Sequence, residues 1–377
     1  MSDNGLKAMT PIAIERPGTI RLGVGTTAEV GRFARAIGAR RALVVCDPFN
    51  ARRVEALGLT CDAVVTGDVA AEPDDRLLAR TVALADEFAP DLIVGFGGGS
   101  AMDLAKVVSV LHRSGLSARE VVGVERTPDR AVALVQVATT AGTGSEAGSR
   151  ALITDSANHA KLAIQSHQML ADLAVLDPLM TVTVPQAVTA ETGIDALAHC
   201  VESFTSVKAH PAVDLYAREG IRLVGAYLRR AVEDGSDLEA RGGMALASLY
   251  GGYCLGPVNT TAGHAVAYPL STRHGIPHGA ANAVIFAHVL AFNAPAAPER
   301  TQEVLRLLGL GDAEDVFQAA DGFCRDIGIE TRLSRRGVPA SDFPAMAREA
   351  GAIRRLLDNN PREVTEQDIR RIYEAAA

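Results

Sequence analysis

Four short runs of apolar, largely β-branched residues recur through the first half of the chain and constrain its fold more than any other feature. They lie at residues 41–46, 62–66, 91–95 and 131–137. Between the second and the third run, residues 74–88 place Leu78, Val82 and Ala85 at helical spacing. Buried strands that alternate with amphipathic helices predict an α/β fold around a mostly parallel sheet, which binds ligands beyond the carboxyl ends of its strands.

The sequence changes character near residue 185. From there, Ala-rich and Leu-rich stretches with few β-branched clusters continue to the C-terminus, and such stretches favour helices. Pro178 and Pro185 interrupt both patterns. A chain of 377 residues, 48% of them hydrophobic, is long enough to fill two cores. We therefore predict an α/β domain at residues 1–184 and an all-α domain at residues 185–377.

Charge and hydropathy argue against several classes of protein. The 37 Lys and Arg residues are outnumbered by 45 Asp and Glu residues, so the basic face that nucleic acid needs is not expected. Residues 1–10 lack the apolar core of a secretory signal, and apolar runs such as 131–139 are too short to span a bilayer. Five cysteines without a CxxC motif predict reduced thiols. We expect a soluble cytoplasmic protein without a membrane or nucleic-acid partner.

A glycine-rich segment follows the third apolar run. It consists of Gly97, Gly98, Gly99 and Ser100 and precedes a helical stretch at residues 101–111. Glycine lets the backbone approach a diphosphate closely, and the N-terminus of the helix offers free N–H groups and a partial positive charge. We predict that this segment binds the pyrophosphate of a dinucleotide; a tight turn without a ligand is the alternative.

A second stretch of small residues follows the fourth run. Its hydroxyls, on Thr139, Thr140, Thr143 and Ser145, can bond phosphate, ribose or the nicotinamide amide, although a tight loop also uses such residues.

Asp47 ends the first run, where a carboxylate can accept from both hydroxyls of an adenosine ribose and repel a 2′-phosphate. NAD is therefore favoured over NADP. Alternatively, Asp47 caps the turn at Pro48 or a helix that follows it.

Three histidines and one aspartate form the candidate metal site. Asp195 and His199 are four residues apart in a helical pattern and share one face. His264 and His278 each lie among apolar or small residues, where an imidazole needs a partner. Three imidazoles with one carboxylate suit Fe(II) or Zn(II) and leave a position for a substrate oxygen. The nearest rival ligand is His274.

Several long motifs in one order resemble the iron-containing (group III) alcohol dehydrogenases, which share the dehydroquinate synthase-like fold. The likeness spans nearly the whole chain, through FGGGSAMDLAK, TTAGTGSE, VLDP, ETGIDALAHCVESF, GIPHGAANAV and NPREVTEQDI. It implies an N-terminal dinucleotide-binding domain, a helical metal-binding domain, iron as the metal and a homo-oligomer.

Carried over by position, the resemblance repeats the metal ligands and the cofactor-binding residues named above. It adds Asp103 and Lys161 as positions near the nucleotide.

The chain departs from the family's pattern at Tyr268. Many relatives carry a histidine at this position, four residues after the third metal ligand, and that histidine is thought to help relay a proton. Tyr268 has three readings: its hydroxyl takes over the relay, it lines the substrate pocket, or it only packs.

These features together predict a metal-dependent alcohol dehydrogenase that passes a hydride between NAD(H) and a small alcohol or aldehyde. Three alternatives share the scaffold: a reductase resembling maleylacetate reductase, a lyase resembling dehydroquinate synthase, and a catalytically silent nucleotide-binding protein. The aspartate at 195 and the GTGSE form of the second loop argue against the first. The second needs a basic phosphate pocket, and the third has no need of four convergent ligands.

Overall fold

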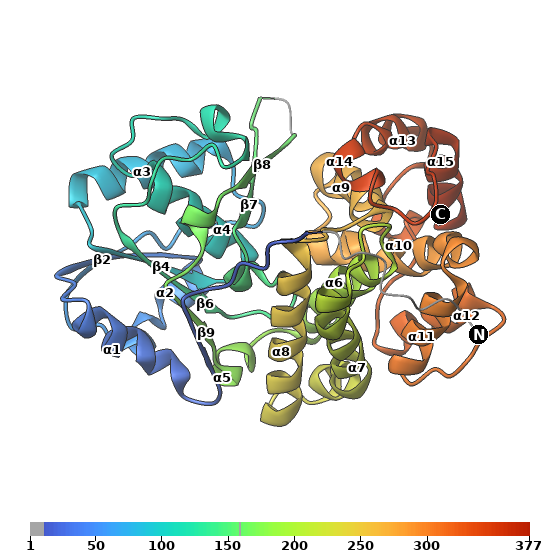
Figure 1. The fold of residues 1–377 in the computed structure, drawn as a ribbon, viewed down its shortest axis with the longest axis horizontal. Coiled ribbons are helices and arrows are strands. Elements are labelled where there is room, and N and C mark those ends of the chain that lie inside the picture. Colours follow the sequence, from blue (N-terminus) through green and yellow to red (C-terminus); the bar gives the residue numbers. More distant parts are fainter. Residues whose placement is uncertain (1–10, 158–159) are drawn as a thin grey trace.

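The computed structural model describes residues 11–157 and 160–377, and it confirms the expected fold class. A six-stranded parallel sheet has the order β1-β9-β6-β4-β2-β3. Its strands are β1 (Thr19–Leu22), β2 (Arg41–Cys46), β3 (Asp62–Val65), β4 (Leu92–Gly97), β6 (Ala133–Ala138) and β9 (Leu173–Leu176). Figure 1 shows this sheet in the N-terminal half of the molecule and helices in the other half.

Helices cover both faces of the sheet. On one face, α3 (Asp75–Phe88) and α4 (Gly99–Leu111) pack on side chains such as Leu43, Ile93 and Leu134. On the other face, α1 (Glu29–Ala36) packs on side chains such as Val44 and Val94. Burial on both faces explains why the strands at the centre of the sheet read as continuous apolar runs.

The sequence predicts a buried strand at residues 62–66, and the structure differs from this prediction. It forms β3, in which Asp62 and Ala63 are exposed and the two valines are only half-buried. The reason is its position at the edge of the sheet, where only β2 pairs with it.

A second, smaller sheet was not expected from the sequence. It has the order β5-β8-β7, with β5 (Gly123–Val124), β8 (Lys161–Gln165) and β7 (Arg150–Thr154), and β7 runs antiparallel to β8. Ala151 and Ile153 of β7 are buried in the core around α4, while Arg150 and Leu152 lie on the opposite face. This sheet therefore presents a partly polar face next to the glycine-rich loops.

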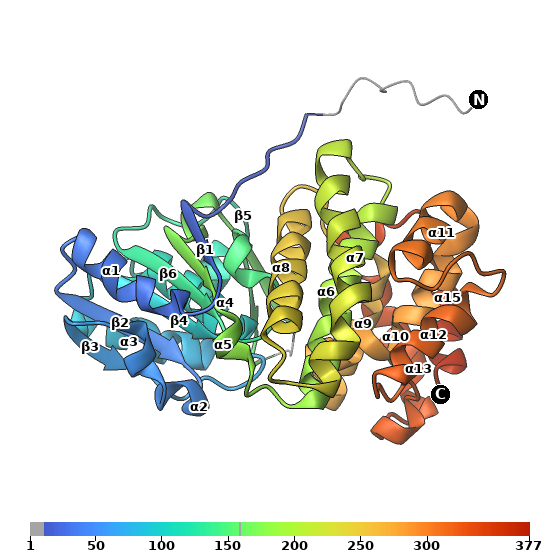
Figure 2. The ribbon, with the colours of Figure 1, turned by 90° about the horizontal axis from the view of Figure 1, so that it is seen from below.

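The C-terminal half is helical. It begins after the short helix α5 (Pro178–Thr181) and contains α6 (Gln186–Thr205), α7 (Pro211–Glu233), α8 (Leu238–Leu255), α9 (Ala262–His274), α10 (His278–Asn293), α11 (Pro298–Leu307), α12 (Val316–Asp326), α13 (Phe343–Gly351), α14 (Arg354–Leu357) and α15 (Glu366–Ala375). Figure 2 shows α6, α7 and α8 side by side, between the sheet and the later helices. The division at residue 184 stays a prediction.

One helical stretch, His278–Ala296, is long and apolar enough by composition to cross a membrane, which the sequence analysis did not anticipate. It lies in the interior, and 61% of its most apolar window is buried. Its apolar character is therefore that of a core helix. The expectation about a secretory signal concerns residues 1–10, which lie outside the described residues.

Candidate metal and nucleotide site

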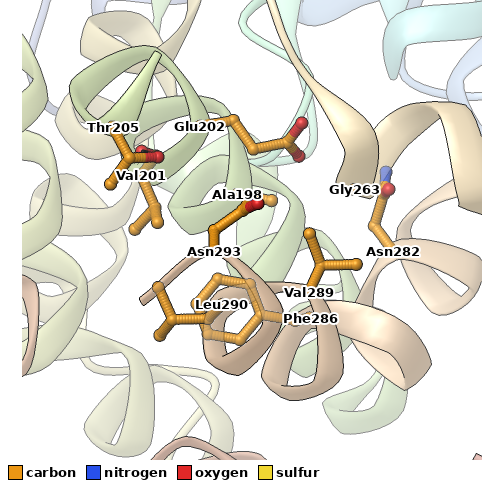
Figure 3. A pocket seen from close by; sticks show the side chains of 10 residues that line it. All are labelled: Ala198, Val201, Glu202, Thr205, Gly263, Asn282, Phe286, Val289, Leu290 and Asn293. Atoms are coloured by element: carbon orange, nitrogen blue, oxygen red, sulfur yellow. Dashed lines mark hydrogen bonds between the residues drawn. The ribbon is translucent and has the colours of Figure 1, made fainter. Parts of the chain in front are cut away.

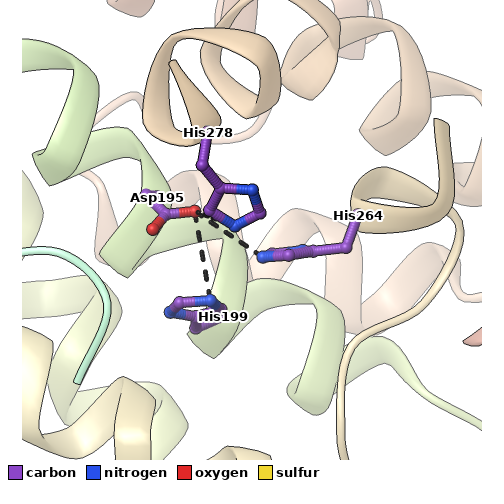
Figure 4. Close-up of side chains that lie close together, drawn as sticks. All are labelled: Asp195, His199, His264 and His278. Carbon is purple, nitrogen blue, oxygen red and sulfur yellow. Dashed lines mark ion pairs between the residues drawn. The ribbon is translucent and has the colours of Figure 1, made fainter. Parts of the chain in front are cut away.

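Four side chains from three helices converge on one point. The middle of α6 carries Asp195 and His199 one turn apart, the first turn of α9 carries His264, and α10 begins with His278. From Oδ1 of Asp195, the Nε2 atoms of His264 and His278 are each 3.6 Å away, and that of His199 is 3.9 Å away. Figure 4 shows the three imidazoles turned toward the carboxylate. One potential ligand atom from each residue lies within 4.8 Å of the other three.

The geometry fits a divalent cation. Two ligands that each lie about 2.1 Å from one ion are about 3.4 Å apart at a tetrahedral angle. The distances from the Asp195 oxygen are of this size. Nε2 of His264 is buried and has no hydrogen-bond partner among the described residues, as expected of an atom that ligates a metal. Three imidazole nitrogens and one carboxylate oxygen are a ligand set that suits Fe(II) or Zn(II).

The electrostatics of the cluster also favour a cation. Burial raises the pKa of the Asp195 carboxyl, but the surrounding imidazoles outweigh burial and hold this pKa well below its usual range. Burial lowers the pKa of His199 to about 4, so this imidazole is neutral and can donate a lone pair. For His264, burial acts in the same direction, but Glu202 and Asp195 raise its pKa to about 10. The cluster therefore has an ionised carboxylate and a position that stabilises positive charge.

Glu202 supports the metal site and was missed by the sequence analysis. Its Oε1 is 2.6 Å from Nδ1 of His264, and its Oε2 accepts from the backbone N–H and the hydroxyl of Thr261. A carboxylate that accepts from one ring nitrogen fixes the tautomer whose other nitrogen faces the metal. The signal was present, since Glu202 is seven residues after Asp195 and three after His199 on one helix face.

Gly263 allows Glu202 to approach. A Cβ at this position would lie 2.4 Å from Oε1 of Glu202, closer than non-bonded atoms can come. The absence of a side chain next to His264 therefore makes room for the carboxylate that orients it.

Asn282 is a second supporting residue that sequence reasoning missed. It lies one turn after His278 on α10, and its Nδ2 donates to Oδ1 of Asp195 at 2.7 Å. Beyond Asn282 and Glu202, a cavity of about 20 Å³ lies among apolar side chains such as Phe286 (Figure 3). This volume holds about one water molecule, so the cavity is not the substrate site.

His274, the rival ligand, and Tyr268, at which the chain departs from the family's pattern, lie in different parts of the structure. His274 lies at the other end of α9, where its Nε2 is 3.4 Å from a carboxylate oxygen of Asp342, and it does not join the cluster. The ring of Tyr268 lies 5.9 Å from that of His278 and lines the main cavity. Its hydroxyl accepts from Arg355 at 3.4 Å. The structure thus favours the pocket-lining reading of Tyr268.

One cavity of about 350 Å³ joins the metal site to the glycine-rich loops. All four proposed metal ligands line this cavity. The other candidate residues that line it are Gly98, Gly99, Ser100, Asp103, Thr140, Thr143, Ser145, Lys161 and Tyr268. A second cavity, of about 340 Å³, is lined by Asp47 and Thr139 and shares Gly98 and Thr140 with the first. Gly97 lines neither of these two cavities. Apart from Gly97, the candidate cofactor residues therefore line two adjoining cavities, and the larger of these contains the candidate metal ligands.

The glycine-rich loops serve packing as well as access. Gly98 caps α4, which begins at Gly99, two residues before its predicted start. A Cβ on Gly99 would lie 2.7 Å from Cγ2 of Thr143, and a Cβ on Gly97 would lie 2.8 Å from that of Ala101. The N-terminus of α4 is thus open to a ligand from the cavity, and glycine is required there even before a ligand binds.

Asp47 adopts the capping role that was the alternative in the sequence analysis. Its Oδ1 accepts from the backbone N–H groups of Phe49 and Asn50 at the start of α2 (Pro48–Ala51), and its Oδ2 accepts from Nδ2 of Asn50 at 2.6 Å. Because a carboxylate oxygen has two lone pairs, capping leaves acceptor capacity toward the second cavity.

Asp103 and Lys161 are tied to other residues at the cavity wall. Asp103 accepts from the hydroxyl of Ser145 and, at 2.9 Å, from the backbone of Leu152, so it joins α4 to both the second loop and β7. Lys161 pairs with Glu72. Burial lowers the pKa of Lys161 to about 8.

The carboxyl group of Glu146, the last residue of the second loop motif, is buried beside this wall. Neither of its oxygens has a hydrogen-bond partner among the described residues. Burial raises its pKa to about 7, although the ammonium of Lys106 acts in the opposite direction. The folded protein thus holds a proton on Glu146 that an unfolded chain would release at lower pH.

Comparison with known proteins places both halves in one family. A family model described as "Iron-containing alcohol dehydrogenase" matches residues 17–178, and one described as "Fe-containing alcohol dehydrogenase family, C-terminal" matches residues 189–377. The long-chain-alcohol dehydrogenase 1 of Geobacillus thermodenitrificans is 33% identical over 98% of this chain and 97% of its own length.

Solved structures agree with these matches. A crystal structure of 1,3-propanediol oxidoreductase is 32% identical, with a TM-score of 0.93 over 98% of this chain and 100% of its own. A sulfoacetaldehyde reductase from Bifidobacterium kashiwanohense, solved in complex with NAD+, is 29% identical, with a TM-score of 0.88 over 98% and 99%. The three similar proteins are named for three different substrates.

Replacing Glu202 tests its role in orienting His264. We expect Glu202→Gln to weaken Zn(II) or Fe(II) binding by about 10- to 100-fold, because the imidazole loses its charged acceptor. Competition with a chelating dye measures the affinity, and Glu219→Gln on the exposed face of α7 is the control. Equal affinities of the Glu202 variant and the wild type would contradict this role.

The buried carboxyl of Glu146 predicts a pH dependence of stability. The pKa of this carboxyl is raised from 4.5 in the unfolded chain to about 7 in the folded protein. Its contribution to the free energy of unfolding is therefore complete below pH 4.5 and is lost as pH rises through 7. The shift corresponds to about 3 kcal/mol. Between pH 4.5 and 8, we expect the free energy of unfolding of Glu146→Gln to rise relative to the wild type by up to this amount.

Urea denaturation of both proteins across this pH range measures the difference, with the exposed Glu363→Gln as the control. Parallel pH profiles of Glu146→Gln and the wild type would show that the carboxyl does not titrate in this way.

Proposed function

Since the chain belongs to the iron-containing alcohol dehydrogenase family, we propose that it transfers a hydride between NAD(H) and a small alcohol or aldehyde, with Fe(II) as its metal. It is a metal-dependent alcohol dehydrogenase or aldehyde reductase by that membership. The cofactor and the metal are the proposed part. The observation that carries the proposal is the convergence of one carboxylate and three imidazoles at the end of the cavity that begins at the glycine-rich loops.

The metal would be held by Asp195, His199, His264 and His278. When bound there, a divalent cation supplies Lewis acidity to the substrate oxygen, which stabilises negative charge on an alcohol and polarises an aldehyde. Glu202 would accept a hydrogen bond from Nδ1–H of His264, which leaves the lone pair of Nε2 free for the metal. This contact holds the His264 ring in one orientation before a substrate binds.

The glycine-rich loops would hold the dinucleotide. The N-terminus of α4, at Gly98 and Gly99, suits the pyrophosphate, and the hydroxyls of Thr140 and Thr143 line the path to the metal site. Asp47, in the second cavity, would accept from the adenosine ribose and disfavour a 2′-phosphate. With its pyrophosphate at α4, the dinucleotide would extend its nicotinamide toward the end of the cavity where the imidazoles converge, where it could exchange a hydride with the substrate carbon.

Three further parts of the proposal concern the location, the assembly and the partners of the protein. We propose that the protein acts in the cytoplasm, as a homo-oligomer, without a membrane or nucleic-acid partner. Its net charge of −8 and five free cysteines support the first and last points. The family resemblance supports the homo-oligomer.

Removing Asp195 tests the metal-dependent reaction. Purified protein is reconstituted separately with Fe(II) and Zn(II) and assayed for aldehyde reduction with NADH and NADPH. We expect Asp195→Ala to lose bound metal and to lower kcat/KM on the order of a thousandfold, because the Lewis acid is lost. Metal content is measured on the same samples. A variant without metal that keeps wild-type activity would refute the proposal.

Replacing Asp47 tests the preference for NAD. Asp47→Ser keeps a side chain that can cap α2 but removes the negative charge. We expect the ratio of kcat/KM for NADPH to that for NADH to rise about tenfold or more, since the repulsion of a 2′-phosphate is relieved. Asp62→Ser, at the exposed end of β3, is the control. An unchanged ratio would assign Asp47 to capping alone.

A further inference from the structure

The β7–β8 sheet carries an arginine into the main cavity. Arg150 on β7 lies directly opposite Gln165 on β8, so their side chains share a face. Arg150, Leu152, Lys161 and Gln165 all line the cavity that contains the metal ligands. Most of the Arg150 side chain is removed from water, and burial lowers its pKa.

The guanidinium of Arg150 is held by neutral groups. Its Nη1 donates to Oδ1 of Asn259 at 2.5 Å, and its Nη2 donates to Oε1 of Gln165 at 3.1 Å. Neither acceptor is charged. A guanidinium has five N–H donors in a planar fork that matches an oxyanion, so two amide acceptors leave donors unused.

Arg150 differs from the other charged side chains that line the cavity, because those have oppositely charged neighbours. Lys161 pairs with Glu72, and Lys106 lies 3.6 Å from Asp103. Asp195 belongs to the metal site. Within the described part of the cavity wall, Arg150 is therefore the cation that has no carboxylate within 4.0 Å. Because buried charges are normally paired, this arrangement favours an anionic partner that comes with the ligand.

The position of Arg150 is also fixed by a strained residue. Asn259 has a φ of 77°, in the left-handed region that residues other than glycine rarely adopt. Its Oδ1 accepts from the N–H of Thr260 as well as from Arg150. Thr260 is in the loop that leads into α9 and therefore to His264. The same strained turn thus positions the guanidinium and begins the segment that carries a metal ligand.

We propose that Arg150 is an anion-binding subsite, which recognises a carboxylate or sulfonate at the far end of a short-chain aldehyde substrate. This inference rests on the proposed function, because it takes the carbonyl of that substrate to lie at the metal site. The nicotinamide would share the cavity of about 350 Å³, so the chain between the carbonyl and the anion should be only a few carbons long.

The reaction leaves the anionic group unchanged. NADH transfers a hydride, with its two electrons, to the carbonyl carbon, and a proton is added to the carbonyl oxygen. The products are NAD+ and a primary alcohol that keeps its carboxylate or sulfonate. Arg150 acts on binding and orientation only.

The test compares aldehydes of similar length with and without an anion. Wild type, Arg150→Gln and Arg150→Lys are assayed with 4-oxobutanoate, 3-oxopropane-1-sulfonate and butanal. We expect the wild type to favour the anionic aldehydes at least tenfold in kcat/KM. Arg150→Gln should lower this ratio by about 10- to 100-fold, mainly through KM, and Arg150→Lys should keep part of it. Arg32→Gln, on the exposed face of α1, is the control.

The outcomes separate the subsite from the proposed function. If the metal-loaded wild type reduces none of the aldehydes, the proposed function fails and the subsite falls with it. If the wild type reduces butanal but does not favour the anions, or if Arg150→Gln leaves the ratio unchanged, only the subsite is overturned. A preference for one of the two anions identifies the group that the subsite takes and supports it.

A binding measurement gives a readout that does not depend on turnover. Calorimetric titration of the NADH-bound, metal-free protein with ethanesulfonate should show binding at least tenfold weaker in Arg150→Gln than in the wild type. The affinity for NADH is measured on the same two proteins. Equal binding of ethanesulfonate, or a matching loss of NADH affinity, would overturn the subsite, since the arginine would then serve the fold or the cofactor.

Discussion

The need to hold one carboxylate and three imidazoles together in the protein interior governs the helical half of the molecule. Buried polar groups that lack enough partners cost free energy, and a cation at the point where these four converge would satisfy them together. Three helices must therefore meet at fixed depth and rotation, because a shift of one residue on α6 turns Asp195 and His199 away from the site. The packing of α6 against its neighbours sets this rotation.

The residues around the ligands show how the interior meets this demand. Glu202 and Asn282 bond His264 and Asp195, and each lies on a helix that also supplies a ligand. Gly263 leaves the space that the Glu202 carboxylate fills. The candidate ligands, the residues that bond them and Gly263 thus form one packed unit, so a change at any of these positions is expected to alter the proposed metal site.

The half of the molecule that contains the large sheet faces the candidate metal ligands through its loops rather than through its strands. The two glycine-rich loops pack on each other, and the cavity runs from them to the imidazoles. The smaller β7–β8 sheet closes the remaining side and brings Arg150 to the same space. One cavity is therefore lined by the glycine-rich loops of one half, by the candidate metal ligands of the other half, and by charged side chains of the smaller sheet.

The sequence by itself determined the main elements and the four candidate ligands. Continuous apolar runs indicate strands buried on two faces, and the spacing of Asp195 and His199 indicates one helix face, because both signals depend only on local periodicity. The same periodicity could have revealed Glu202. Only the tertiary structure decided that β3 is an edge strand, that residues 150–154 pair with residues 161–165 in a second sheet, and that His264 joins the cluster while His274 does not. It also decided that Arg150 has no carboxylate partner among the described residues. These facts depend on which segments distant in sequence become neighbours. A local sequence pattern does not specify which distant residue a side chain will contact in the folded protein.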